Sequence, residues 1–229
     1  MLGILIQLLI SWGILFWYKR KGLTPLGLMP TFPRLRLFIF FLLLSAFCAV
    51  SRYLVRLYFG KELWELNPNL NAALVWDGIW WNMKSVLFEE LIFRGALFYI
   101  IWDKWGPKQA IVISSIAFGI YHWFSYEVWG MPVQMAIYFV ATGLAGLLYS
   151  YAFVKTKSML IPIAMHFGWN FIGNFVFSEG TIGKGILVMT EQPIVNVSVF
   201  IYYLAMWNPM VMFLLINFLV LRKINKNDI

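Results

Sequence analysis

Five ionisable residues lie within long apolar stretches of this sequence, with the fourth of them towards the end of its stretch: Glu89, Glu90, Arg94, His122 and His166. The chain contains 2 histidines, and both belong to this set. A charged side chain near the centre of a lipid bilayer costs from about 3 to more than 10 kcal/mol. These residues are therefore candidates for a functional site, although a structural polar cluster that holds helices together would have the same composition.

The spacing of these residues favours acid–base chemistry. Glu90 and Arg94 are four residues apart, so on a helix they share one face and can form an ion pair. Glu89 is turned by about 100° from Glu90 and can face a neighbouring helix. Because Arg94 offsets one of the two negative charges, the other carboxylate is suited to act as a general base.

A second pair, His166 and Asn170, is also four residues apart and shares one helix face. Two side-chain donors in this arrangement are typical of a site that holds an oxyanion. The residue patterns of other kinds of intramembrane protease are absent from this sequence. No glycine is followed two residues later by serine, HExxH is absent, and all three aspartates lie outside the apolar stretches. The sequence therefore argues against a serine, zincin-type or aspartyl site.

The composition predicts a helical membrane protein. Hydrophobic residues make up 62% of the 229 residues and charged residues only 12%, about half the charge of a soluble domain. The apolar stretches are longer than the roughly ten-residue alternating strands of an outer-membrane barrel. The net charge of +8 then indicates orientation in the membrane rather than a nucleic-acid partner.

The expected fold is all-α, with about seven transmembrane helices in a single membrane domain over residues 1–229 and the site in the core of the bundle. We expect the first span to be a retained helix, because no basic residue precedes it and Lys19, Arg20 and Lys21 follow it. An interfacial helix over Leu70–Met83 is expected to run into the third span. The predicted spans are Leu2–Tyr18, Leu37–Val50 (extending up to Tyr58), Lys84–Trp102, Gln109–Phe124, Val133–Val154, Ser158–Phe177 and Ile194–Leu221.

The connections between these spans alternate in charge. The odd-numbered connections and the tail carry 12 basic and 2 acidic residues, whereas the even-numbered ones carry 5 basic and 6 acidic residues. Basic loops stay on the cytoplasmic side of a cell membrane. The sequence therefore predicts an N-terminus outside the cell and a cytoplasmic C-terminus.

Three motifs in order give the sequence a family resemblance. Glu89-Glu90-Leu-Ile-Phe-Arg94 matches EExxxR, Phe118-Gly-Ile-Tyr-His122 matches FxxxH, and His166-Phe-Gly-Trp-Asn170 matches HxxxN. Together they resemble the CPBP family of CAAX proteases and bacteriocin-processing enzymes, also called the Abi family. The motif-bearing core covers about residues 84–177.

The resemblance implies an intramembrane endopeptidase with a glutamate-protease fold. By that resemblance Glu89 activates a water molecule, His122 orients it, and His166 and Asn170 stabilise the tetrahedral intermediate. The substrate would be a membrane-associated peptide or protein, in the cell membrane of what is by analogy a prokaryote. The resemblance indicates neither a natural substrate nor an oligomeric state.

The same resemblance gives supporting roles to Glu90 and Arg94. Phe118 would pack beside His122, although an ordinary core aromatic residue is an equally good interpretation. No cofactor is expected, because a glutamate base needs none. The alternative is zinc held by Glu89, His122 and His166, with one coordination position left open.

Two functions of other classes stay open from the sequence. One is a non-catalytic membrane scaffold or bacteriocin-immunity factor that keeps the fold. The other is a proton-coupled transporter, in which intramembrane glutamate and histidine residues relay ions.

Overall fold

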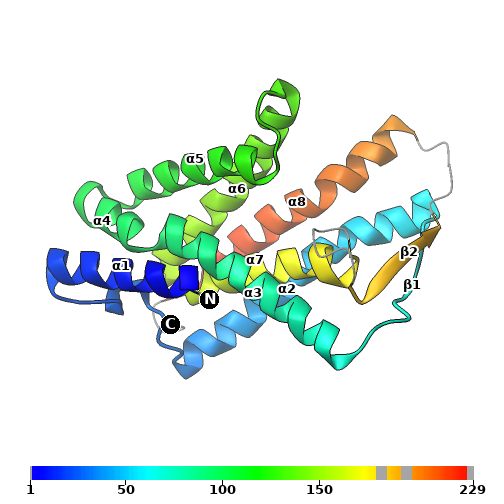
Figure 1. Cartoon of the computed structure of the whole chain (residues 1–229). Helices are drawn as coiled ribbons and strands as arrows, with labels where there is room; N and C mark the ends of the chain where they lie inside the picture. Colours follow the sequence, from blue (N-terminus) through cyan, green and yellow to red (C-terminus); the bar gives the residue numbers. More distant parts are fainter. Residues whose placement is uncertain (1, 179–184, 192–197, 226–229) are drawn as a thin grey trace. The chain divides into compact units, whose positions relative to one another are not determined.

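The computed structural model describes residues 2–178, 185–191 and 198–225, and most of these residues are helical (Figure 1). The short elements are the 3-10 turn Thr24–Leu26 and the π-helical turn Ile172–Val176, with strands β1 (Leu63–Leu66) and β2 (Leu187–Glu191). The α-helices in this part of the chain are α1 (Leu2–Lys19), α2 (Phe32–Gly60), α3 (Ala72–Arg94), α4 (Ala96–Trp105), α5 (Pro107–Ser125), α6 (Pro132–Thr156), α7 (Leu160–Phe171) and α8 (Val199–Lys223). The predicted helical membrane fold is confirmed.

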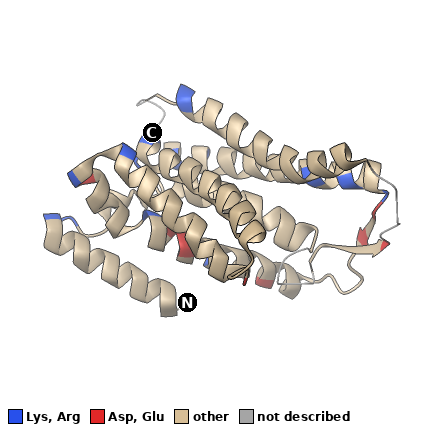
Figure 2. Cartoon of the chain, turned by 90° about the horizontal axis from the view of Figure 1, so that it is seen from above, with Lys and Arg blue, Asp and Glu red and all other residues tan. Residues whose placement is uncertain are grey.

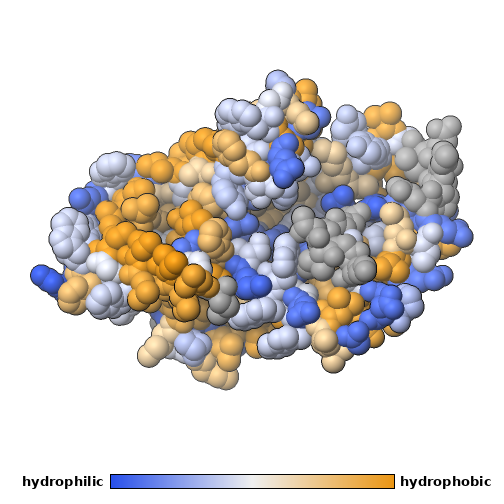
Figure 3. Space-filling model, in the orientation of Figure 1, coloured by the Kyte–Doolittle hydropathy of each residue, from blue (hydrophilic) through white to orange (hydrophobic). Residues whose placement is uncertain are grey.

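Four of the described helices are long and apolar enough to cross a membrane: α1, α2, α6 and α8. They correspond to the first, second, fifth and seventh predicted spans, although residues 194–197 of the seventh lie outside the described residues. Large apolar side chains on α1 face outward, with Leu2, Leu9 and Trp17 exposed by 73%, 68% and 82%. The surface over α1 is accordingly hydrophobic in Figure 3, and Figure 2 shows Lys and Arg mostly near helix ends. Lipid is the solvent that such helices require.

The third predicted span, Lys84–Trp102, is not one helix. Helix α3 begins at Ala72, includes most of the predicted interfacial segment and ends at Arg94, and α4 begins at Ala96. Between them, a Cβ atom on Gly95 would overlap the backbone oxygen of Leu91. The backbone therefore turns at a residue that only glycine can occupy without displacement, which the apolar pattern alone does not show.

A second tight corner joins α4 to α5. Gly106 has a φ of +92° and donates its N–H to the Trp102 carbonyl, which ends α4. Pro107 then begins α5, a position where proline loses no helical hydrogen bond. These two residues turn the chain between α4 and α5, and α5, which carries His122, packs against both α4 and α6.

The described chain forms two compact units, and their limits fall within α2, α3, α7 and α8. Unit 1 comprises Met1–Phe38, Leu87–Ile163 and Phe218–Ile229, and unit 2 comprises Ile39–Val86 and Ala164–Asn217. The single membrane domain expected from the sequence stays a prediction. Each unit is described by itself below.

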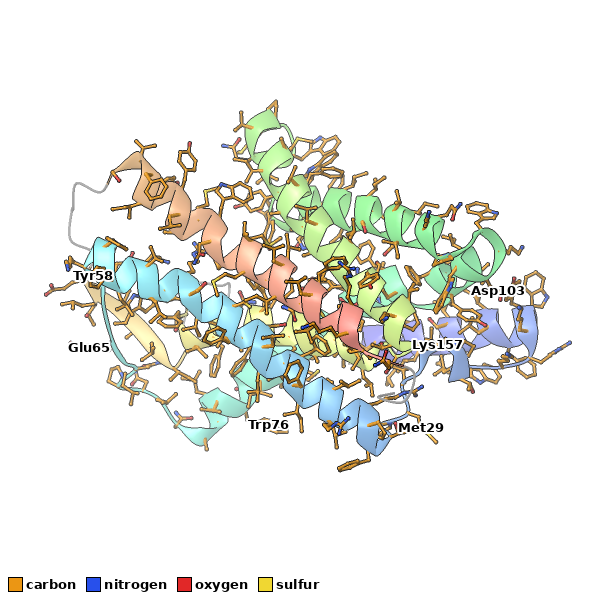
Figure 4. The ribbon with its side chains drawn as sticks, turned by 180° about the vertical axis from the view of Figure 1, so that it is seen from behind. Met29, Tyr58, Glu65, Trp76, Asp103 and Lys157 are labelled. Atoms are coloured by element: carbon orange, nitrogen blue, oxygen red, sulfur yellow. The ribbon has the colours of Figure 1, made fainter. Side chains whose placement is uncertain are left out.

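Unit 1 is held together by close helix packing and a few polar contacts. On α5, Gly119 lies so near the Phe139 ring of α6 that a Cβ atom would be 2.7 Å from it. Ser150 of α6 donates to Ser114 of α5 (3.3 Å). At the far end of α4, Asp103, labelled in Figure 4, accepts hydrogen bonds from Lys19 and Tyr18 of α1. Small residues thus let α5 and α6 approach directly.

Unit 2 contains a short antiparallel sheet that the sequence analysis did not anticipate. Strand β1 pairs with β2, and Leu66 lies opposite Leu187. Beneath it, Tyr53 of α2 stacks on Phe177 with ring centroids 3.7 Å apart, and Trp64 meets both rings edge-on. The sheet therefore closes over an aromatic cluster rather than adding a membrane span.

Candidate active site

Unit 1 contains a buried carboxylate–imidazole pair. Glu89 on α3 and His122 on α5 are exposed by 8% and 5%. Glu89 Oε2 and His122 Nε2 are 3.9 Å apart. Two of the residues predicted to form the site are thus neighbours, although they belong to different helices and are 33 positions apart in the sequence.

The other ring nitrogen of His122, Nδ1, fixes the orientation of the imidazole ring. Nδ1 lies 2.7 Å from the backbone oxygen of Phe118. Because a carbonyl oxygen can only accept, Nδ1 is the protonated donor in this contact, and Nε2 is the ring nitrogen that faces Glu89. One turn of α5 therefore holds both the orientation and the tautomer of the histidine.

The separation between Glu89 and His122 suits a bridging water molecule. A distance of 3.9 Å is too long for a direct hydrogen bond. A water molecule about 2.8 Å from each atom would fit this gap and hydrogen-bond to both groups. The pair can thus orient a nucleophilic water and accept its proton.

The predicted ion pair between Glu90 and Arg94 is present and fully buried. Arg94 Nε donates to Glu90 Oε2 (2.6 Å), and a second, parallel bond joins Nη2 to Oε1. This bidentate geometry is the strongest form of a carboxylate–guanidinium contact. The Glu90–Arg94 pair is neutral overall, and Glu89 precedes it directly on α3.

Aromatic rings surround the Arg94 guanidinium. Its Cζ atom lies 4.6 Å from the ring centroid of Phe118, 5.4 Å from that of Tyr149 and 5.6 Å from that of Phe93. Such cation–π contacts gain strength where water is absent. Phe118 also meets the His122 ring edge-on, at 4.5 Å. The predicted packing of Phe118 beside His122 is therefore present.

Sequence analysis missed Tyr149. The residue lies on α6 and is exposed by 2%, yet the sequence contains 11 tyrosines and no spacing separates this one from the others. Its burial next to Arg94 depends on how α6 packs against α5, which no local pattern encodes. Its place within the predicted fifth span does not distinguish it either, because Tyr138 and Tyr151 lie in the same span.

His166 and Asn170 lie on α7, in unit 2. His166 is buried and Asn170 is half-buried, one helical turn away, as the spacing predicts. Between them, a Cβ atom on Gly168 would overlap the Leu42 backbone of α2, so α7 and α2 are in direct backbone contact there. Their convergence with Glu89 and His122 stays a prediction.

The π-helical turn Ile172–Val176 follows these residues directly. Such turns are often found at functional sites. Asn174 within it donates to Asn82 of α3 (3.2 Å), and Asn82 donates to the Gly78 carbonyl (2.9 Å). These two asparagines link the π-helical turn to α3 within unit 2, and sequence analysis did not identify either of them.

The described residues of unit 1 contain no group of three histidine, cysteine, aspartate or glutamate side chains that could hold a metal ion. Glu89 and His122 supply two donors, and His166, the third ligand of the zinc alternative, belongs to unit 2. A zinc site would therefore need a ligand from outside unit 1.

A family comparison agrees with the motifs. Residues 71–172 match the family model described as type II CAAX prenyl endopeptidase Rce1-like. No curated protein and no solved structure matches the chain in the corresponding searches. The four long apolar helices support a membrane protein, and the matched part of the chain is similar to a family of proteases. The matched residues include all three motifs, so the match supports the resemblance to an Rce1-type family.

Proposed function

We propose that this protein is an intramembrane endopeptidase that hydrolyses a peptide bond of a membrane-associated peptide or protein. The observation that carries the proposal is the buried pair of Glu89 and His122, with 3.9 Å between Oε2 and Nε2. The similarity of residues 71–172 to a protease family supports the class of reaction.

In the proposed reaction, a water molecule binds between Glu89 and His122. Glu89 takes one proton from this water while His122 Nε2 holds the other by a hydrogen bond. The resulting hydroxide attacks the carbonyl carbon of the scissile bond. Glu89 then gives its proton to the departing amine nitrogen, which leaves a carboxylic acid on one product and an amine on the other.

The negative charge that develops on the carbonyl oxygen must be stabilised by hydrogen-bond donors. His166 and Asn170 fill this role in the proposal, since both carry side-chain N–H groups on one face of α7. The neutral Glu90–Arg94 pair stays outside the proton transfer and supports the helix that carries Glu89. No metal takes part in this scheme.

The proposed substrate is reached within a cell membrane, in the orientation that the loop charges favour, with a cytoplasmic C-terminus. In that orientation Glu89 and His122 lie towards the outer half of the bilayer. Labelling of single cysteines introduced at Lys104 and Glu127, with Cys48 replaced by serine, tests this orientation. An impermeant reagent added outside should label the cysteine at Glu127 and not the one at Lys104, and the reverse result would contradict the orientation.

The function is tested with Glu89→Gln, which keeps size and hydrogen bonding but removes the base. Purified wild-type protein in proteoliposomes should cleave a membrane-anchored peptide substrate, and Glu89→Gln should not. Glu65→Gln, an exposed glutamate on β1 labelled in Figure 4, is the matched control and should cleave like wild type.

Three further measurements separate the alternatives. Cleavage that survives a zinc chelator supports the metal-free reaction, and its loss with recovery on zinc addition would favour the zinc alternative. Full complementation of a deletion phenotype by Glu89→Gln would contradict a proteolytic role and favour a scaffold. Ion-dependent uptake by proteoliposomes without cleavage would favour a transporter.

A further inference from the structure

We propose that Gly146 and Tyr149 of α6, which lie outside all three motifs, position His122 by confining Phe118. The functional consequence rests on the proposed function, whereas the effect on the imidazole does not. The argument depends on contacts within unit 1 alone.

Phe118 connects the two polar parts of the site. Its backbone oxygen accepts the hydrogen bond from His122 Nδ1 (2.7 Å). Its ring lies 4.5 Å from the His122 ring and 4.6 Å from the Arg94 guanidinium carbon. A shift of Phe118 therefore reaches the imidazole both through the hydrogen bond and through the ring contact.

Gly146 sets the position of Phe118 from the side of α6. A Cβ atom added at Gly146 would be 3.0 Å from Phe118 Cδ1, 3.2 Å from its Cβ and 3.3 Å from its Cγ. Contacts this short involve the base of the side chain, which cannot rotate away from them. Any residue larger than glycine would therefore push Phe118, together with the turn of α5 that carries it.

The rings of Tyr149 and Phe93 also pack against the Phe118 ring and restrict its movement. The Tyr149 ring meets the Phe118 ring edge-on at 6.2 Å, and the Phe93 ring meets it at 5.0 Å. Tyr149 is exposed by 2% and Phe118 by 2%. A displaced Phe118 has no empty space to enter, because protein interiors are close-packed.

The consequence for catalysis follows from the width of the gap between Glu89 and His122. The 3.9 Å between Oε2 and Nε2 suits one water molecule, and a change of a few tenths of an ångström alters how that water is held. Misplacements of about 1 Å can cost roughly 100-fold in rate. We expect Gly146→Ala to lower kcat roughly tenfold with a smaller change in KM.

The experiment uses the scarcity of histidine in this chain. With 2 histidines in the sequence, His166→Gln leaves His122 as a single imidazole for ¹⁵N NMR in detergent micelles. In this background the Nδ1-protonated signal of His122 is expected to shift or broaden in Gly146→Ala. Gly143→Ala is the matched control, because its Cβ atom would meet Ser115 O at an ordinary 3.6 Å. Its spectrum should equal that of the parent.

Tyr149→Leu provides a second variant in case Gly146→Ala does not fold. It removes the ring that backs Phe118 without adding a clash, and it should disturb the same His122 signals. Unchanged His122 signals in the folded variants would overturn the proposal. If these signals change but the wild-type protein, which keeps His166, cleaves no membrane-anchored peptide, the positioning would be upheld and the proposed function rejected, so the two failures are distinguishable.

Discussion

Two glutamate–arginine pairs in the described part of the chain invite comparison, one fully buried and one partly buried. In unit 1, Glu90 binds Arg94, whose guanidinium lies against Phe118. In unit 2, Glu62 binds Arg56 (2.8 Å), whose guanidinium lies against aromatic rings in the same manner.

The difference lies in what stands beside each pair. Glu62 also accepts a hydrogen bond from the Trp64 indole (3.1 Å), so the pair in unit 2 anchors β1 beside α2. The pair in unit 1 has a second carboxylate, Glu89, next to it in the chain, and this carboxylate faces the imidazole of His122. An arginine-paired glutamate under aromatic rings is therefore a structural device in both units, and the additional carboxylate–imidazole pair distinguishes the candidate site.

The largest expected effect on stability comes from breaking the pair in unit 1. Glu90→Gln leaves the Arg94 charge buried without its counterion and should destabilise the folded protein by about 3–5 kcal/mol. Unfolding in mixed micelles, followed by tryptophan fluorescence, measures this loss. The double variant Glu90→Met/Arg94→Met should recover most of it, and a double variant as unstable as the single one would show that the charge is not the cause.

The next largest effect, this time on the rate of cleavage, is expected at the proposed oxyanion donors. Asn170→Ala should lower kcat by about 100- to 1,000-fold, the usual cost of removing one such donor. Steady-state cleavage of a membrane-anchored peptide checks it, with Asn208→Ala on α8 as a control outside the motifs. Equal kcat in Asn170→Ala and wild type would remove α7 from the proposed mechanism.

The pair in unit 2 should affect stability without affecting chemistry. Glu62→Gln weakens charge-assisted hydrogen bonds to Arg56 and Trp64 and should cost about 2 kcal/mol. The same micelle unfolding assay measures it. Cleavage by the folded variant is expected to match wild type, and a loss of kcat like that of Glu89→Gln would mean that the two pairs are not functionally different.

The smallest effect is expected at the exposed contact between α1 and α4. Hydrogen bonds from Lys19 and Tyr18 hold the pKa of the Asp103 carboxyl below its usual range. A lowered pKa means that this contact stabilises the fold above the unfolded pKa of about 3.9 and is lost as the pH falls through the folded value. Asp103→Asn should therefore lower the unfolding midpoint slightly at pH 7, and this difference should shrink as the pH falls below about 3.9. A difference that grows as the pH falls would contradict this assignment.

Much of the local structure could be predicted from the sequence because it depends on helical spacing. Glu90 and Arg94 pair as residues four apart should, and Phe118 lies against His122 for the same reason. The turn at Gly95 was missed because the apolar pattern continues through it. The β1–β2 sheet was missed because its strands are short and distant in the sequence.

Contacts between helices lay beyond the reach of sequence analysis. Tyr149 of α6 lies close to Arg94 of α3, and glycines at the contact between α5 and α6 let these two helices approach closely. The small-residue spacing of α6 indicates that some helix packs there, but not which side chain it confines. Roles that depend on two helices, such as the Glu89–His122 pair, needed the family resemblance before the structure brought the side chains together.

The most direct measurement of the central claim is hydrolysis in water enriched in ¹⁸O. Wild-type protein in proteoliposomes, given a membrane-anchored peptide, should yield a product whose new carboxyl group carries one ¹⁸O atom by mass spectrometry, because Glu89 activates the attacking water. Glu89→Gln should yield no labelled product under the same conditions. Labelled product from Glu89→Gln at the wild-type rate would contradict the assignment of Glu89 as the base.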